Sequence, residues 1–199
     1  MRILSFIKRL SKSKAVPVPV DPNGYLPSFW EDDYCQIEIV PWENKEFIEE
    51  QIRRTNNSTV KLRDEHGFTK IFERSSMPIT SLSKEFRIDY WENALVGFGF
   101  IKAKYIRYDS GEIIDCKKSN TKAYGFTNFT IFFDIEDEFV KNIWLSIGVL
   151  DSAKQFETIK LALYCLGEEY EFILIDWNSL ELIDLRNRVK IDKYLMAYW

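Results

Sequence analysis

Strand-like segments follow one another through the middle of this chain, and helical patterns flank them. β-Branched and aromatic residues are frequent in residues 90–108, 112–116, 126–135 and 143–149, with a further short run at 67–73. A cluster of strands bordered by helices is typical of α+β folds. The sequence therefore predicts an α+β fold, with a mostly antiparallel sheet and flanking helices.

Two more strands complete the predicted sheet. Residues 34–40 alternate so that Cys35, Ile37 and Ile39 share one side, which predicts a strand. Residues 170–177 are strongly apolar, and we expect them to form a central strand. The acidic run at 136–138 separates two strands as a turn.

Helical spacing appears in three segments: 42–55, a stretch from 151 or 152 to 166, and a last helix from about residue 187. The last helix places Ile191, Tyr194, Leu195 and Tyr198 on one apolar face. We expect residues 56–58 to break the first helix and Gly167 to end the second. Gly97 and Gly99 indicate a bulge in a strand, and residues 109–111 a hairpin turn.

The first twenty residues differ from the rest in charge. They contain five of the 27 basic residues and no acid, and their apolar residues predict a short amphipathic helix over residues 1–14. The Val-Pro alternation at 16–20 predicts an extended tether. Residues 21–199 are expected to form a single α+β domain. They keep 22 basic against 31 acidic residues, a net charge of −9.

This acidic balance disfavours nucleic acid as a partner and favours a basic protein. The basic start lacks a small-residue cleavage site, and no apolar run approaches the length of a membrane span. We therefore expect a cytoplasmic protein without stable membrane insertion. Cys35, Cys116 and Cys165 are far apart and odd in number, which predicts reduced thiols rather than a disulfide framework.

Catalytic motifs are missing from the chain. It has one histidine, His66, with no partner indicated for it, and it has no Gly-rich phosphate loop, Cys-x-x-Cys pair or Gly-x-Ser-x-Gly elbow. On a strand, Asp134 and Glu136 would share a face and could hold Mg²⁺, but a solvated turn is the favoured interpretation. The sequence thus predicts no catalytic residue, no cofactor and no metal.

One alternative is an enzyme. Residues 113–117 resemble the hydrophobic strand and Asp/Glu-x-Lys element of restriction-like nucleases, in which Asp115 would bind metal and Lys117 would polarise a phosphate. Asp89 or Asp109 would supply the second ligand. The acidic body lacks the positive charge that DNA binding needs. A second alternative is a membrane-surface adaptor acting through residues 1–14.

A family resemblance joins these observations. The chain has a basic start (1–10), a Pro-rich tether, an aromatic and acidic segment (25–34), and a closing pattern at 176–178, 184–185 and 191–195. In this layout it resembles the bacterial immunity proteins of polymorphic toxin systems, which act in interbacterial competition. The resemblance implies a cytoplasmic protein without catalysis that neutralises one cognate toxin domain by occluding its active site.

A basic toxin domain, such as a nuclease, would suit the acidic and aromatic composition. The first candidates for toxin binding are the densest aromatic and acidic run in an expected loop: Phe29, Trp30, Glu31, Asp32 and Asp33. Phe29 and Trp30 could equally fold onto the core. The second candidates are the acidic residues of the predicted turn: Glu136, Asp137 and Glu138.

Overall fold

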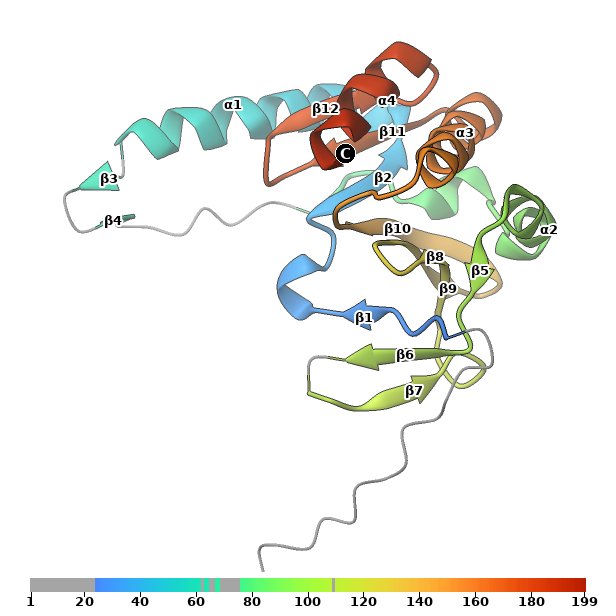
Figure 1. Ribbon diagram of the computed structural model, residues 1–199. Coiled ribbons are helices and arrows are strands. Elements are labelled where there is room, and N and C mark those ends of the chain that lie inside the picture. The colour runs from blue at the N-terminus through green and yellow to red at the C-terminus, as the bar shows by residue number, and fades with distance from the viewer. Residues whose placement is uncertain (1–23, 62, 65–66, 69–75, 109) are drawn as a thin grey trace, which may run out of the picture.

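A seven-stranded antiparallel sheet forms the centre of the fold (Figure 1). The structure is a computed structural model that describes residues 24–61, 63–64, 67–68, 76–108 and 110–199. The strands lie in the order β12 (Glu181–Asp184), β11 (Phe172–Asp176), β2 (Ile37–Pro41), β10 (Phe139–Ile147), β9 (Phe129–Glu136), β8 (Thr121–Phe126) and β5 (Ile101–Lys102). Each neighbouring pair is antiparallel, which confirms the predicted α+β class.

Different elements cover the two faces of this sheet. The helices α2 (Ile88–Phe98), α3 (Ala153–Tyr170) and α4 (Arg188–Leu195) pack on one face. The opposite face carries α1 (Lys45–Lys61) and a small mixed sheet of β1 (Ser28–Phe29), β6 (Tyr105–Tyr108) and β7 (Ile113–Asp115). A two-stranded pair, β3 (Arg63–Asp64) and β4 (Gly67–Phe68), lies at the far end of α1 (Figure 1).

Alternation along the strands divides the core into separate clusters. On β9, Ile131 and Phe133 point into the cluster beneath the helices, whereas Phe132 points into the cluster beneath the small sheet. On β11, Leu174 joins the helix side and Ile173 packs with α1. All five side chains are at most 1% exposed. The large sheet is therefore buried on both faces, which explains the continuous apolar run of β11.

The predicted strand at 90–108 is wrong in its first half. Residues 88–98 form α2, and Ile88, Trp91 and Leu95 face the core at helical spacing. Gly99 adopts φ 103° and caps the helix, with its N–H donating to Val96 O at 2.9 Å. The glycine therefore ends a helix, because its positive φ suits a helix C-terminus, and marks no bulge in a strand. β5 and β6 follow.

Two predicted helix ends are also wrong. α1 runs through residues 56–58 to Lys61, since Asn and Ser cost a helix only tenths of a kcal/mol and no glycine or proline follows there. Gly167 lies inside α3, which ends at Tyr170 with Glu171 in the left-handed region at φ 56°. A Cβ at Gly167 would lie 2.5 Å from the Leu185 carbonyl carbon, so close packing requires the glycine.

The strand predictions need three corrections. β1, β3, β8 and the edge strand β12 were not expected, and β1 places Phe29 on a strand rather than in a loop. Cys35 is not on β2, because it adopts φ 53° in the preceding turn and packs in the cluster beneath the small sheet. β11 is paired on both sides but lies second from one edge of the sheet, so it is not central.

Other predictions are confirmed. Ile37 and Ile39 share one face of β2. Gly111 adopts φ 82° and donates to Tyr108 O at 2.8 Å, which closes the predicted hairpin between β6 and β7. The turn at 136–138 joins β9 to β10. The predicted segments at 1–20 and 69–73, together with His66 and Asp109, lie outside the described residues.

The C-terminal helix is fixed to the sheet by a buried carboxylate. Asp176, at the end of β11, is 2% exposed and accepts hydrogen bonds from the hydroxyls of Tyr194 and Tyr198, both at 3.1 Å. Its other oxygen accepts the backbone N–H groups of Asn178 at 2.9 Å and Ser179 at 3.3 Å. Four donors thus compensate the burial of one charge. Ile191, Tyr194 and Leu195 are buried, as their spacing predicted.

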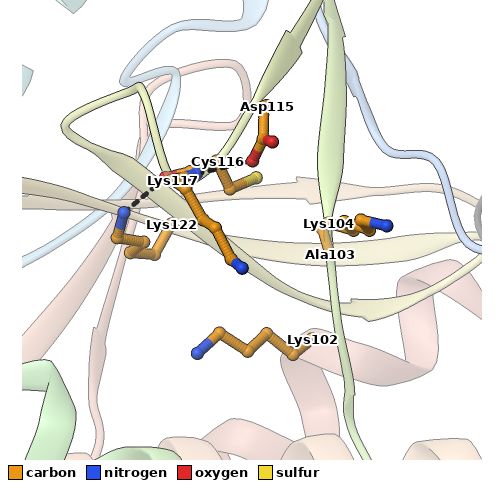
Figure 2. Close-up of a pocket in the computed structure, with 7 residues that line it drawn as sticks. All are labelled: Lys102, Ala103, Lys104, Asp115, Cys116, Lys117 and Lys122. Atoms are coloured by element: carbon orange, nitrogen blue, oxygen red, sulfur yellow. Dashed lines mark hydrogen bonds between the residues drawn. The ribbon is translucent and has the colours of Figure 1, made fainter. Parts of the chain in front are cut away.

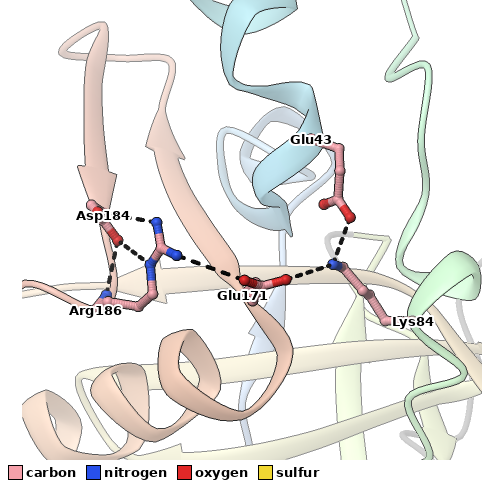
Figure 3. Close-up of polar contacts among 5 residues, drawn as sticks. All are labelled: Glu43, Lys84, Glu171, Asp184 and Arg186. Atoms are coloured by element: carbon pink, nitrogen blue, oxygen red, sulfur yellow. Dashed lines mark hydrogen bonds and ion pairs between the residues drawn. The ribbon is translucent and has the colours of Figure 1, made fainter.

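A chain of ion pairs joins the start of α1 to the end of α3 and the loop before α4 (Figure 3). Lys84 bridges Glu43 at 2.8 Å and Glu171 at 3.9 Å, and Arg186 bridges Glu171 at 3.8 Å and Asp184 at 3.2 Å. Burial acts to raise the pKa of Glu43, but the hydrogen bond and charge of Lys84, together with a backbone hydrogen bond, outweigh it, and the pKa lies below its usual value. The carboxylates of Glu43 and Glu171 are exposed, so these pairs orient the elements more than they stabilise them.

Candidate functional site

The first candidate segment, residues 29–33, separates into a buried and an exposed part. Phe29 packs inward, stacked on Tyr108 at 4.9 Å between ring centroids and edge-on to Trp144 at 4.9 Å. Trp144 is fully buried and stacks on Phe132 at 3.9 Å. Phe29 therefore belongs to the core, whereas Trp30, at 51% exposed, does not.

Residues 31–33 form a single exposed 3₁₀ turn after Trp30. The N–H of Asp33 donates to Trp30 O at 3.0 Å, and the N–H of Tyr34 donates to Glu31 O at 3.2 Å. Among the residues that the structure describes, no partner forms an ion pair with Glu31, Asp32 or Asp33. The turn thus presents three carboxylates, unpaired within the described part of the chain, beside an exposed indole.

Tyr34 fixes this turn to the large sheet. Its hydroxyl donates to Asp134 Oδ2 at 3.0 Å and accepts from Asn142 Nδ2 at 3.1 Å. Its ring meets Trp144 edge-on at 5.5 Å. Burial, together with the nearby Cys35 and Asp134, raises the pKa of Tyr34, so the phenol remains a donor. The segment is consequently held at both ends, by Phe29 and by Tyr34.

A polar cavity of about 230 Å³ lies beside Trp30. Its lining includes Ser28, Asn128, Thr130 and Ser146, which come from β1, the loop between β8 and β9, the start of β9 and the end of β10. The exposed indole therefore borders a hollow with several hydrogen-bonding groups. This arrangement can accept a protruding side chain of a protein partner.

The second candidate segment differs in its charge balance. Glu136 pairs with Lys141 at 2.6 Å, and Glu138 pairs with Arg87 at 2.9 Å. Two of its three carboxylates are thus already compensated within the protein. It begins at Glu136, the last residue of β9, while Trp30 lies beside the first residues of that eight-residue strand. The structure does not bring Trp30 and this turn together.

The geometry of the nuclease alternative is incomplete. Asp115 Oδ1 accepts the backbone N–H of Lys117 at 2.8 Å, which ties the carboxylate to its own turn. Asp89 pairs with Arg87 at 2.9 Å, and the hydrogen bond from Arg87 holds its pKa below the usual value. Asp109 lies outside the described residues. Within the described ranges, no group of three His, Cys, Asp or Glu side chains could hold a metal ion.

Asp134 and Glu136, the two carboxylates considered as Mg²⁺ ligands, both have other partners in the protein. Asp134 accepts from Tyr34 and from the Thr121 hydroxyl, the latter at 2.8 Å, while Glu136 binds Lys141.

No helix in the described part of the chain is long and apolar enough to cross a membrane. The adaptor hypothesis depends on residues 1–14, which the structure does not describe.

Sequence reasoning missed the residues that support the candidate surface. Asp134 and Asn142 bind Tyr34 across sequence separations of 100 and 108 residues, so no local pattern indicates them. Comparison with known proteins finds no family model, no curated protein and no solved structure that matches this chain. Its function is therefore argued from this geometry and from the resemblance given above.

Proposed function

We propose that this protein is an immunity protein that binds a cognate toxin domain stoichiometrically and occludes its active site. The observation that carries the proposal is the exposed Trp30 on a fixed turn, beside three carboxylates, Glu31, Asp32 and Asp33, that form no ion pair with any described residue. The net charge of −9 over residues 21–199 supports a basic partner. The partner is a protein and not a nucleic acid, and the protein itself turns over no substrate.

The chemistry of the turn suits such an interface. Trp is among the residues that most often dominate binding energy, and Trp30 needs no rearrangement to become accessible. The three carboxylates can pair with basic groups of a toxin without first breaking an internal ion pair. Because Phe29 and Tyr34 hold the segment in place, little conformational entropy is lost on binding. Residues 136–138 lack this advantage, since two of their carboxylates already have partners.

Charge reversal tests the proposal. The toxin domain is taken from the product of the gene immediately upstream. Changing Glu31, Asp32 and Asp33 to lysine should slow association roughly tenfold or more at low salt, because the carboxylates steer the encounter. The control reverses Glu46, Glu168 and Glu181, which are exposed, form no ion pair in the described part of the chain and give the same change in net charge. This control should retain most of the association rate.

Trp30→Ala distinguishes the contribution of the indole to the bound complex from the effect of the carboxylates on the association rate. It should leave association nearly unchanged and speed dissociation, raising Kd by roughly 30-fold for a loss of about 2 kcal/mol. Protection of cells that express the toxin should fall in parallel. The proposal fails if the purified protein neither binds nor protects against that toxin. If the wild-type protein binds and protects but the variants at residues 30–33 bind the toxin as well as the wild type does, the function stands and the interface lies elsewhere.

A further inference from the structure

A cavity of about 360 Å³ opens where β5, β7 and β8 approach one another (Figure 2). Four lysines line it: Lys102, Lys104, Lys117 and Lys122. Ala103 and Cys116, both nearly fully buried, also line it and are apolar. Ligand sites in proteins commonly have volumes of roughly 300–1,000 Å³, so the cavity is large enough for a small molecule.

Backbone pairing brings these side chains together from separate segments. The N–H of Cys116 donates to Lys104 O at 3.0 Å, and the N–H of Ala103 donates to Ala123 O at 2.8 Å. Lys122 donates to the carbonyl oxygens of Cys116 and Ser119. The segments that form the cavity are thus joined by hydrogen bonds, and the site lies where the large sheet meets the small one rather than on one loop.

The charges in this cavity oppose those of the whole protein. Lys102 binds Glu92 at 2.6 Å, and Asp115 is the one carboxylate among the lining residues. In Figure 2 the side chain of Lys117 extends toward that of Lys102, which runs across the view beneath it. Lys117 forms no ion pair with any residue that the structure describes. Glu92 balances the charge of Lys102, whereas an anion in the cavity would balance the charge of Lys117.

We propose that this cavity binds a small organic anion through a phosphate or carboxylate group placed between Lys102 and Lys117. The apolar body of the ligand would lie against Ala103 and Cys116. Lys104 at the rim would add charge without a fixed contact. The site binds rather than reacts, because burial raises the pKa of the Cys116 thiol to about 11 and keeps it protonated at neutral pH.

Calorimetric titration of the full-length protein with three probes tests the site: pyrophosphate, citrate and phenyl phosphate. We expect saturable one-to-one binding that weakens as salt rises. Pyrophosphate and citrate distinguish phosphate from carboxylate recognition, and phenyl phosphate should gain from the apolar wall. Amide NMR shifts on titration should concentrate at residues 102–104 and 115–122.

Variants locate the charge requirement. Lys117→Gln should weaken binding of the best probe roughly tenfold, and adding Lys102→Gln should weaken it roughly tenfold again. Lys118→Gln is the matched control, because Lys118 is exposed, adjacent in sequence and outside the lining, so its affinity should stay within about twofold. A melting curve checks that each variant folds. If the double variant does not fold, Lys117→Gln alone tests the charge requirement.

Three results would overturn the proposal: no saturable binding by any probe, shifts located away from the cavity, or equal affinity in Lys117→Gln and wild type. None of these experiments involves a toxin. Failure here therefore leaves the proposed inhibitory function untouched, and failure of toxin binding leaves the anion site untouched.

Discussion

The two faces of the large sheet are built differently. Beneath α2, α3 and α4 lies the larger cluster of aliphatic and aromatic side chains, such as Ile39, Phe133 and Leu174, and the buried Asp176 also binds the hydroxyls of Tyr194 and Tyr198 there. On the opposite face, polar groups are buried among the apolar ones. Tyr25 hydrogen-bonds Thr130 at 2.9 Å, and Trp177 Nε1 donates to Glu38 at 2.6 Å.

This difference separates stability from surface chemistry. The helix-covered face buries the larger apolar cluster, which is the main source of folding free energy, and adds specific contacts at Asp176 and Gly167. The opposite face uses paired polar groups to orient the small sheet and the Trp30 turn. Both candidate sites, the Trp30 surface and the lysine cavity, adjoin the small sheet on that second face. We therefore expect mutations on the first face to act on stability and those on the second to act mainly on binding.

The strongest test of this comparison is Leu195→Ala on α4. Leu195 is fully buried between α4 and the sheet, in the core of the helix-covered face. Its truncation should therefore lower the free energy of unfolding by about 2–5 kcal/mol. Leu161→Ala on α3 makes the same chemical change at a side chain that is 40% exposed, and should cost far less. Urea denaturation measures both. Equal losses would show that α4 does not depend on this core.

A pair of glycines provides the next test. Gly167→Ala should destabilise by about 1–3 kcal/mol, because the new Cβ would overlap the Leu185 backbone, which has little freedom to move. Gly97→Ala on α2 meets no atom within 4 Å and should stabilise by about 0.5–1 kcal/mol through helix propensity. Thermal melts of both variants should therefore shift in opposite directions. Shifts of the same sign would contradict the close contact between α3 and the loop before α4.

On the opposite face, Tyr34→Phe should have a smaller effect. It removes the hydroxyl that joins Asp134 and Asn142 while keeping the ring against Trp144. Loss of this hydroxyl should cost about 0.5–1.5 kcal/mol in urea denaturation. Tyr90→Phe is the control, because Tyr90 is 73% exposed, and it should change stability by no more than about 0.5 kcal/mol. A loss as large as that of Leu195→Ala would remove the distinction between the two faces.

Sequence patterns predicted elements whose periodicity is unambiguous. β2 alternates over a short apolar run, and α4 has both an Asn187 cap and an apolar stripe, so local signals agree. The segment of α2 is predicted as a strand because its aromatic residues, Tyr90, Trp91 and Phe98, favour strands by composition, although its buried residues recur at helical spacing. Packing decided that conflict, since three buried side chains on one helical face outweigh local propensity.

The candidate surface was predictable only in part. Composition indicated residues 29–33. Whether Phe29 is buried depends on its packing against Tyr108 and Trp144, which lie far along the chain, and Trp30 makes no such contact. The lysine cavity depends on the register of three strands, one of which was not expected. Both sites are thus products of long-range pairing, which residue spacing does not encode.

The smallest effect concerns the thiol of Cys116, which lies in the core beneath the small sheet. Burial, with Asp115 nearby, raises its pKa from the usual 9.0 to about 11, despite the opposing charge of Lys122. A raised pKa favours the protonated thiol in the folded protein, so this contribution to stability is present at neutral pH and is lost as the pH rises toward 11. At pH 8, roughly one thiol in a thousand is thiolate, and alkylation should be slow.

The measurement is the alkylation rate of the Cys116 peptide by mass spectrometry between pH 8 and pH 10, with circular dichroism confirming the fold. The rate should rise about tenfold per pH unit without levelling, because the thiolate fraction keeps growing below a pKa near 11. The same peptide in denatured protein should level off near its ordinary pKa. Levelling of the native rate below about pH 9.5 would mean that water reaches the thiol freely. The opposite face would then be less tightly closed than the helix-covered one, and the apolar wall of the proposed anion site would be lost.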